Sequence, residues 1–258
     1  MNMAFSFTHI SEEKRLKIRF AREMEFFLAR RNKGIPLVHD VRRRASVKDI
    51  IESFGVPHTE IMEIGFNGIP VDFSFVPGHG GELVVAAVEP PFDVTADHLL
   101  RPALKQVKFI ADLNVLKLGR YLLLLGFDVS LARQLTDGEI AAAAGKERRI
   151  VLTRDTRLLY RKKIEFARRI RASQPMVQLK ETLEFFGLIP DPGLFFTRCT
   201  ACNLVLTPVA KADIDLRLEP KTRKYFNHFL TCPGCDQIFW RGSHYEAVQS
   251  RFRAAGIF

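Results

Sequence analysis

Residues 107–131 read VKFIADLNVLKLGRYLLLLGFDVSL, and this stretch decides the fold of the central part of the chain. Val107–Ala111 is a compact apolar run that predicts a buried strand. Leu113–Leu125 then places apolar side chains at helical spacing, and Gly126 is expected to end that helix. Phe127–Leu131 is typical of a second strand. A strand, a helix and a strand in this order predict two parallel strands joined by a crossover helix.

The same alternation continues beyond residue 131. The sequence Thr136-Asp-Gly-Glu139 opens a helical run over Ile140–Ala144, which Gly145 is expected to end. Arg149–Thr153 predicts another apolar strand. Strands that alternate with helices are typical of an α/β domain with a parallel sheet. We assign residues 105–190 to this domain.

Three aspartates stand near the ends of these elements. Asp112 ends the first strand, Asp155 follows the last one, and Asp137 lies in the first turn of the helix between them. Because the carboxyl ends of parallel strands and the neighbouring helix N-termini line one crevice, the three carboxylates are expected to converge. Carboxylate oxygens are the ligands that Mg²⁺ and Mn²⁺ prefer. Such a metal would activate water for attack on a phosphodiester.

Helix capping is the alternative role for each of these acids. An aspartate just before a helix accepts backbone N–H groups of the first turn and complements the helix dipole, and spacing alone does not decide between cap and ligand. Thr136 and Glu139 have the spacing of a capping box, so Glu139 is expected to be a reciprocal cap. Asn114, two residues after Asp112, is either an added ligand or an exposed capping residue.

All four cysteines lie in two Cys-x-x-Cys pairs, Cys199/Cys202 and Cys232/Cys235. Two such pairs deliver four thiolates to one tetrahedral Zn²⁺, so we predict a structural zinc site in a zinc-ribbon module at residues 191–258. A redox Cys-x-x-Cys motif and a pair of disulfides in an exported protein are the alternatives. The 29 residues between the pairs, 203–231, predict an inserted arm.

Residues 12–90 carry a different pattern. Strands are predicted at residues 16–20, 36–43, 61–66, 70–75 and 82–88, with a turn at Asn67-Gly68. Ser46 is expected to cap one amphipathic helix, which Gly55 ends. The order ββαβββ indicates a separate domain, followed by a linker at residues 91–104.

The net charge of +10 is unevenly distributed. Residues 1–100 hold 12 Lys and Arg against 14 Asp and Glu, whereas residues 101–190 hold 18 against 9 and residues 191–258 hold 9 against 6. The basic part of the chain is expected to bind a polyanion, and nucleic acid is favoured over a membrane. Four basic residues next to or after the third aspartate, Asp155, are predicted to contact RNA phosphates: Arg154, Arg157, Lys162 and Lys163. A solvated helix face is the alternative.

Targeting signals are not expected. Met1–Ile10 contains no uninterrupted apolar run, so a secretory signal is not predicted. No segment reaches the roughly 20 apolar residues of a membrane span. Because the cysteines are reserved for metal, a reducing, cytoplasmic location is expected.

Several of these motifs carry a family resemblance. Phe109-Ile-Ala-Asp112, Leu118-Gly-Arg-Tyr-Leu-Leu-Leu-Leu-Gly126 and Phe196-Thr-Arg-Cys-Thr-Ala-Cys-Asn203 resemble the Mut-seven C-terminal RNase family. Asp137-Gly-Glu-Ile, followed by Ile150-Val-Leu-Thr-Arg-Asp155, is similar to the paired signature of PIN-like nucleases. Ala45-Ser-Val-Lys-Asp-Ile-Ile-Glu52 resembles the ubiquitin-like β-grasp domain that is fused to members of the same RNase family.

The resemblance implies an α/β protein of three parts: an N-terminal β-grasp (ubiquitin-like) domain, a central PIN-like parallel α/β nuclease domain and a C-terminal zinc ribbon. It implies a ribonuclease that hydrolyses RNA phosphodiester bonds, with structural Zn²⁺ on the four cysteines and catalytic Mg²⁺ or Mn²⁺ on Asp112, Asp137 and Asp155. PIN nucleases commonly carry a further acid on an early helix, and residues 113–125 contain none. A non-catalytic RNA-binding or adaptor protein is therefore the alternative.

The β-grasp part is also similar to small sulfur carriers, which act through a free terminal Gly-Gly. In this chain the His79-Gly-Gly81 stretch is internal, and the chain ends in Gly256-Ile-Phe258. Carrier chemistry is therefore not expected. We expect the β-grasp domain to bind a protein partner or to orient RNA.

Overall fold

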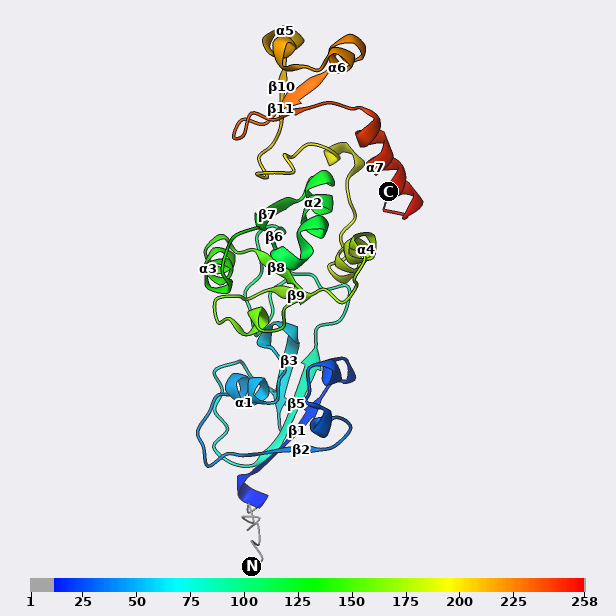
Figure 1. The fold of residues 1–258 in the computed structure, drawn as a ribbon. Helices are drawn as coiled ribbons and strands as arrows, with labels where there is room; N and C mark the ends of the chain where they lie inside the picture. Colours follow the sequence, from blue (N-terminus) through cyan, green and yellow to red (C-terminus); the bar gives the residue numbers. More distant parts are fainter. Residues whose placement is uncertain (1–11, 258) are drawn as a thin grey trace, which may run out of the picture. The chain divides into compact units, whose positions relative to one another are not determined.

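The structure, a computed structural model, describes residues 12–257. The chain divides into two compact units, Met1–Leu104 and Lys105–Phe258, which Figure 1 traces from blue to red. The prediction that no secretory signal is present concerns Met1–Ile10, which lie outside the described residues. None of the helices in the described part of the chain is both long enough and apolar enough to cross a lipid bilayer.

The first unit is built on a five-stranded mixed sheet with the order β2-β1-β5-β3-β4. β1 and β5 are parallel, and the other neighbours are antiparallel. The strands are β1 (Arg15–Phe20), β2 (Leu37–Asp40), β3 (Ile61–Phe66), β4 (Ile69–Pro70) and β5 (Gly81–Ala87). Short 3-10 helices lie at Glu12–Lys14, Arg22–Phe26, Arg30–Asn32 and His58–Glu60. This mixed sheet with one α-helix is the expected β-grasp arrangement.

Local signals in the first unit behave as predicted, with one exception. Ser46 Oγ accepts a hydrogen bond of 3.2 Å from the Asp49 N–H and so caps α1 (Val47–Ser53). Asn67 and Gly68 both have positive φ and form the predicted turn. The predicted strand at 70–75 is wrong, because β4 ends at Pro70. The Asp72 carboxylate accepts bonds from the N–H and O–H of Ser74, which bends the chain there.

Residues 91–104, which were expected to be a linker, belong to the first compact unit. Phe92 and Leu104 are buried, and the Arg101 side chain is only 5% exposed. The Arg101 guanidinium donates to the backbone oxygens of His58 (3.1 Å) and Ile61. These bonds satisfy backbone carbonyls of the first unit with a charged donor, which fixes this segment on that unit.

The second unit contains the predicted parallel sheet, with the order β7-β6-β8-β9. The strands are β6 (Lys108–Asp112), β7 (Asp128–Ala132), β8 (Ile150–Thr153) and β9 (Ala167–Arg169). The helices of this α/β part are α2 (Leu116–Leu124), α3 (Asp137–Glu147) and α4 (Pro175–Phe185), with 3-10 turns at Leu113–Val115, Leu158–Tyr160 and Pro192–Leu194. α2 packs on β6, β7 and α4, whereas α3 packs on β6 and β8, and Figure 1 places α3 and α4 on opposite sides of the sheet.

Close packing leaves no room for a side chain at two positions of this unit, Gly119 and Gly145. A Cβ atom at Gly119 would lie 2.6 Å from Leu131 Cδ2 and 2.7 Å from Ala111 Cβ, so the glycine lets α2 approach the sheet closely. Gly145 was expected to end α3, but the helix continues to Glu147 and ends at Arg148 in the left-handed conformation. A Cβ atom at Gly145 would lie 2.9 Å from the Lys163 carbonyl oxygen. Gly145 therefore serves close packing, and the prediction of a helix stop was wrong.

The last part of the second unit is a three-stranded antiparallel sheet with the order β10-β11-β12. Its elements are β10 (Thr207–Val209), α5 (Lys211–Ile214), a 3-10 turn at Asp215–Arg217, α6 (Pro220–Tyr225), β11 (Phe229–Thr231), β12 (Ile238–Phe239) and α7 (Ser243–Ala254). We call residues 199–239 the ribbon. The predicted inserted arm is present as β10, α5, α6 and β11, and it has a small core of its own around Ile214, Leu218 and Phe229.

Candidate functional site

The four cysteines of the ribbon form one cluster. Cys199, Cys202, Cys232 and Cys235 all carry free thiols, and their sulfur atoms lie within 4.8 Å of one another. The Sγ atoms of Cys199 and Cys235 are 3.6 Å apart, and those of Cys202 and Cys232 are 3.2 Å apart. A tetrahedral Zn²⁺ with Zn–S bonds of about 2.3 Å requires sulfur separations of about 3.8 Å. The cluster can therefore hold a metal such as zinc.

The two cysteine pairs fold in the same way. In the first, the Cys199 sulfur accepts from the Ala201 N–H, and in the second the Cys232 sulfur accepts from the Gly234 N–H, both at 3.4 Å. The residue after each pair, Asn203 or Asp236, has positive φ and donates its N–H to the carbonyl of the first cysteine. We call residues 199–204 and 232–237 the two knuckles. Each presents two sulfurs on one side of a tight turn.

The protonation of the cysteines differs within the cluster. Burial raises the pKa of the Cys199 thiol. Burial also acts on Cys232, but hydrogen bonds from the Cys235 N–H and the Cys202 thiol outweigh it and lower the pKa of Cys232 to about 6. The thiolate is the form of cysteine that ligates a metal. The donor set thus fits a metal that takes sulfur ligands.

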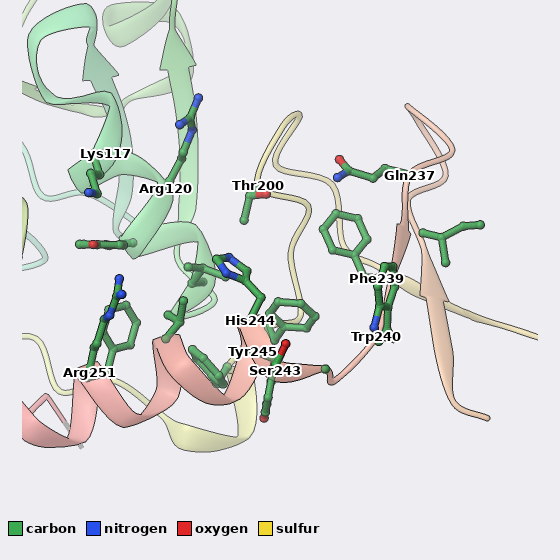
Figure 2. A pocket seen from close by; sticks show the side chains of 18 of the residues that line it. Lys117, Arg120, Thr200, Gln237, Phe239, Trp240, Ser243, His244, Tyr245 and Arg251 are labelled. Carbon is green, nitrogen blue, oxygen red and sulfur yellow. The ribbon is translucent and has the colours of Figure 1, made fainter. Parts of the chain in front are cut away.

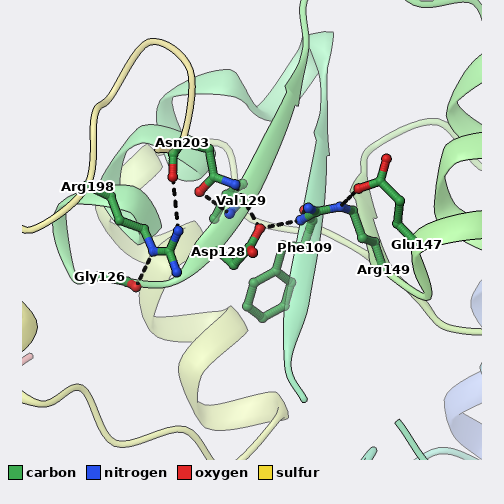
Figure 3. A network of polar contacts seen from close by, with 8 residues as sticks. All are labelled: Phe109, Gly126, Asp128, Val129, Glu147, Arg149, Arg198 and Asn203. Carbon is green, nitrogen blue, oxygen red and sulfur yellow. Dashed lines mark hydrogen bonds and ion pairs between the residues drawn. The ribbon is translucent and has the colours of Figure 1, made fainter. Parts of the chain in front are cut away.

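The first knuckle is hydrogen-bonded to the edge of the parallel sheet, as Figure 3 shows. Asn203 Oδ1 accepts from the Val129 N–H at 3.0 Å, and Asn203 Nδ2 donates to the Asp128 carboxylate at 2.8 Å. Arg198 donates to the Gly126 carbonyl at 2.9 Å. Because β7 is the edge strand, its outward N–H at Val129 would otherwise lack a ladder partner. The cluster and the α/β sheet are therefore linked by direct hydrogen bonds.

A buried arginine completes this network. Arg149 donates to the Asp128 carboxylate at 2.5 Å and to Glu147 at 2.6 Å, and its side chain is 9% exposed. Burial alone would raise the pKa of Asp128, but the hydrogen bonds from Arg149 and Asn203 outweigh it and hold that pKa below its ordinary value. The Asp128 carboxylate is thus charged, and it joins the knuckle to the sheet.

Asp112 and Asp155 lie at the carboxyl ends of two neighbouring strands, β6 and β8, where the strand order reverses direction. β6 lies between β7 and β8, so the crossovers from β6 to β7 and from β7 to β8 run in opposite directions. In such sheets, ligands bind at the carboxyl ends of the strands where the direction reverses. Asp112 is the last residue of β6, and Asp155 lies two residues beyond the end of β8.

Thr153 connects these two aspartates. Its hydroxyl donates to Asp112 Oδ2 at 2.6 Å and accepts from the Asp155 N–H at 2.9 Å. Thr153 is fully buried at the end of β8. Asn114 reinforces the connection, because its amide donates to Asp112 Oδ2 at 2.6 Å and accepts from the Arg154 N–H at 2.9 Å. The loops after β6 and β8 are therefore held together by side chains.

Both aspartates also accept the backbone hydrogen bonds of a capping residue, the role that the sequence could not distinguish from metal binding. Asp112 Oδ1 accepts from the Leu113 N–H at 2.6 Å, and Asp155 Oδ1 accepts from the Arg157 N–H at 2.8 Å. Asp155 Oδ2 has no hydrogen-bond donor among residues 12–257. Capping and a free carboxylate oxygen thus coexist at Asp155. Glu139 is the reciprocal cap of Thr136, as predicted.

Asp137 has a separate partner. It is the first residue of α3, and its carboxylate forms an ion pair of 3.5 Å with Arg161. Within residues 12–257, the cysteine cluster is the one group in which three or more His, Cys, Asp or Glu ligand atoms come within 4.8 Å of one another. The three aspartates are more widely spaced than that. Mg²⁺ keeps several waters and takes only one or two carboxylates directly, so a site of this kind does not require the three carboxylates to touch.

The basic run after Asp155 divides into two groups. Arg168 stacks on Phe185 and pairs with Glu181, and Arg169 donates to the Thr156 hydroxyl at 2.9 Å. These two arginines stabilise the fold around β9. The four residues predicted to contact phosphate all have exposed side chains: Arg154, Arg157, Lys162 and Lys163. Arg154 and Arg157 lie within two residues of Asp155, and Lys162 and Lys163 follow in the next loop.

Sequence reasoning missed Thr153, Asn203 and Asp128 as parts of the site. Thr153 was visible only as the first residue of the Thr-Arg-Asp motif. The bond between Asn203 and Asp128 joins residues 75 positions apart, so no local pattern indicates it. A polar residue directly after a cysteine pair was the one available signal, because Asn tolerates the left-handed conformation that ends a knuckle.

Comparison with known proteins gives two matches in chain order. A family model described as Mut7-C RNAse domain matches residues 107–252. A second, described as Mut7-C ubiquitin, matches residues 13–93. Comparison with curated proteins found no match, and comparison with solved structures found none either.

The first match covers more than half of the chain and includes both the aspartate loops and the four cysteines. The second covers the mixed β-grasp sheet of the first unit. Both agree with the resemblance drawn from the motifs. The chain therefore belongs to the Mut7-C RNAse domain family and carries a Mut7-C ubiquitin domain ahead of that domain.

Proposed function

We propose that this protein is a metal-dependent ribonuclease that hydrolyses RNA phosphodiester bonds. The observation that carries the proposal is the pairing of Asp112 and Asp155 through Thr153 at the point where the strand order reverses. The match to a family described as an RNase domain supports the same reaction class.

Each aspartate has a role in this proposal. Asp112 is held by three donors, from Leu113, Asn114 and Thr153, so its carboxylate is preorganised. Asp155 would offer its free Oδ2, and Asp137, which pairs with Arg161, would be the third carboxylate of the site. These carboxylates would hold Mg²⁺ or Mn²⁺, which supplies a Lewis acid and a water of lowered pKa.

The RNA backbone would approach along the exposed cations next to Asp155. Arg154 and Arg157 flank that residue directly, and Lys162 and Lys163 follow in the next loop. Each phosphate that such a side chain neutralises releases counterions and adds affinity that falls with salt. We propose that these four residues contact phosphates on either side of the scissile bond.

We propose that the cysteine cluster holds structural Zn²⁺. Four sulfur ligands close the tetrahedral shell and leave no position for a substrate water, so this metal would fold the ribbon and take no part in hydrolysis. The hydrogen bonds from Asn203 to the edge strand then transmit that folding to the sheet. Four free thiols favour a reducing compartment, and on that ground we propose a cytoplasmic location.

We propose that the ubiquitin-like unit binds a protein partner. Its exposed apolar side chains include Ile35, Val38, Ile69 and Val84. The match to a family model described as Mut7-C ubiquitin supports this proposal. We keep the predicted boundaries as part of the proposal: residues 12–90 for this domain, 105–190 for the nuclease and 191–258 for the ribbon module, with residues 91–104 between the first two.

The test is cleavage of labelled RNA, both structured and unstructured, with and without Mg²⁺ or Mn²⁺. We expect divalent-dependent cleavage by the wild-type chain and at least a hundredfold loss in Asp155→Asn, which keeps the Oδ1 acceptor for Arg157. Asp213→Asn is the matched control, because Asp213 is an exposed aspartate of the ribbon arm. Cleavage at equal rates by wild type and Asp155→Asn would overturn the proposal.

A non-catalytic RNA-binding or adaptor protein is the second candidate. It is favoured by the lack of any acid in Leu113–Leu125 and by the ion pair that occupies Asp137. Both candidates predict salt-dependent RNA binding. Binding with no divalent-dependent cleavage on any RNA of the panel identifies the second candidate.

A further inference from the structure

A cavity of about 660 Å³ lies in the second unit, away from the aspartate loops. α2, α7 and the ribbon enclose it, as Figure 2 shows. Its inner wall is aromatic: the Tyr245 ring lies 5.1 Å from that of Phe195 and 5.0 Å from that of Phe196, and the Phe196 ring is 5.9 Å from that of Phe239. Trp240 and Tyr121 also line the cavity.

The rim of the cavity is cationic. Lys117 and Arg120 project from α2, and His244 and Arg251 project from α7. None of the described residues that line the cavity is Asp or Glu. Among residues 12–257, neither Lys117, Arg120 nor Arg251 forms an ion pair with a carboxylate. Three permanent positive charges thus stand around an aromatic wall.

We propose that this cavity binds an unpaired segment of the RNA substrate, with bases against the aromatic wall and phosphates at the rim. This inference rests on the proposed ribonuclease function and adds a substrate class to it, namely single-stranded RNA. Every base has a flat face that stacks on an aromatic ring, whatever the RNA sequence. An acidic peptide would satisfy the rim but would leave the aromatic wall without flat partners.

The size of the cavity favours an unpaired strand. Its volume lies within the range of about 300–1,000 Å³ that accommodates single small ligands. Bases in a duplex are stacked inside the helix, and proteins read double-stranded RNA mainly by its shape and backbone. A duplex cannot place a base against a recessed aromatic wall without opening.

The position of the cavity also suits a substrate contact. Lys117 and Arg120 lie one turn apart on the same face of α2. α2 begins four residues after Asp112 and is nine residues long, which corresponds to about 13 Å at 1.5 Å per residue. Lys117, the second residue of α2, follows Asp112 by five residues and lines the cavity. An RNA strand held there reaches the aspartates along one helix.

Trp240 provides a direct reporter, because it is the only tryptophan of the chain and it lines the cavity. We would titrate the full-length, zinc-loaded protein with an unpaired octanucleotide RNA, with the same RNA in a duplex and with an oligoglutamate peptide. Trp240 fluorescence and RNA anisotropy would be recorded without Mg²⁺ or Mn²⁺, so cleavage plays no part. We expect the unpaired RNA to quench Trp240 and to bind at least tenfold more tightly than the duplex.

Two double variants test whether the unpaired RNA binds in the cavity. Arg120→Gln with Arg251→Gln should weaken binding of the unpaired RNA at least tenfold. Lys146→Gln with Arg253→Gln is the matched control, because it removes the same charge from exposed positions outside the cavity, and it should change binding by less than threefold. Equal weakening by both double variants, equal affinity for the duplex, or equal quenching by the peptide would overturn the inference.

The outcome separates the two proposals. If the unpaired RNA binds as expected but the wild-type chain never cleaves it, the ribonuclease proposal fails and the binding site stands. If the chain cleaves RNA but the Arg120/Arg251 variant binds and cleaves normally, the ribonuclease proposal stands and the cavity is not a substrate site.

Discussion

The side-chain amide of Asn203 donates a hydrogen bond of 2.8 Å to the carboxylate of Asp128. Asn203 follows the first cysteine pair in its knuckle, and Asp128 begins the edge strand of the parallel sheet. The two residues are 75 positions apart in the chain. This bond, with the neighbouring one from Val129 to Asn203, makes the folding of the ribbon and the stability of the α/β sheet interdependent.

The first prediction tests this link. Asn203→Ala removes both bonds to β7 and places alanine in a left-handed conformation, so we expect a loss of about 2–4 kcal/mol in the free energy of unfolding of the second unit. Asp236→Ala is the matched control, because Asp236 holds the same position in the second knuckle but is exposed and pairs only within the ribbon. It should cost about 1 kcal/mol. Urea unfolding measures both, and equal losses would contradict the link.

A second prediction concerns pH. The pKa of Asp128 is held below its ordinary value, so its contribution to stability is present above about pH 4 and is lost as the pH falls through the lowered pKa of the folded state. Asp128→Asn lacks this contribution at every pH. The stability difference between wild type and Asp128→Asn should therefore be constant from pH 7 to about pH 5 and shrink below about pH 4. Loss of metal in acid affects both proteins equally, so the difference in their free energies of unfolding reports on Asp128 alone. A difference that grows as the pH falls would refute the lowered pKa of Asp128.

Metal removal gives a third prediction. We expect one zinc per chain, and a ligand present at a hundred times its dissociation constant stabilises a protein by about 2.7 kcal/mol. Chelation should therefore lower the stability of the parallel sheet as well as that of the ribbon. Cys202→Ser should lose the metal, whereas Ala201→Ser, at an exposed position inside the same knuckle, should keep it. Metal analysis with thermal unfolding measures both effects, and sheet stability that is indifferent to chelation would count against the coupling.

The fourth prediction contrasts two glycines. Gly119→Ala should destabilise the protein by about 1–3 kcal/mol, because the new methyl group overlaps Leu131 and Ala111 on the sheet. Gly138→Ala should stabilise it by about 0.5–1 kcal/mol, because the position is helical and the nearest atom to a new Cβ is 4.0 Å away. Thermal unfolding of the two variants should shift in opposite directions. Shifts of the same sign would contradict the packing of α2.

Features with local causes were predictable from the sequence. The Thr136–Glu139 capping box and the Ser46 cap depend on residues three positions apart, and both are confirmed. The alternation of strands and helices after residue 107 reflects burial of each element, and the parallel sheet is confirmed as well.

Features with distant causes were not predictable. Gly145 looked like a helix stop, but its small size accommodates a backbone carbonyl at Lys163, on a loop whose path the sequence does not give. Thr153 became part of the site only through the register of β6 beside β8. The cationic rim of the cavity comes from α2 and α7, which are more than 100 residues apart, and most of its aromatic wall comes from segments between them. Convergence of all three aspartates stays a prediction.

The central claim is that Asp112 and Asp155 act together in RNA hydrolysis, and a double-mutant cycle on the cleavage rate tests it most directly. The rate would be measured in Mg²⁺ and in Mn²⁺ for wild type, Asp112→Asn, Asp155→Asn and the double variant, with zinc content and unfolding recorded for each. Residues that work as one unit give strongly non-additive losses. The proposed site predicts at least a hundredfold loss in each single variant and no further loss in the double variant. Four chains that cleave at the same rate, or a wild-type chain with no divalent-dependent cleavage, would contradict it.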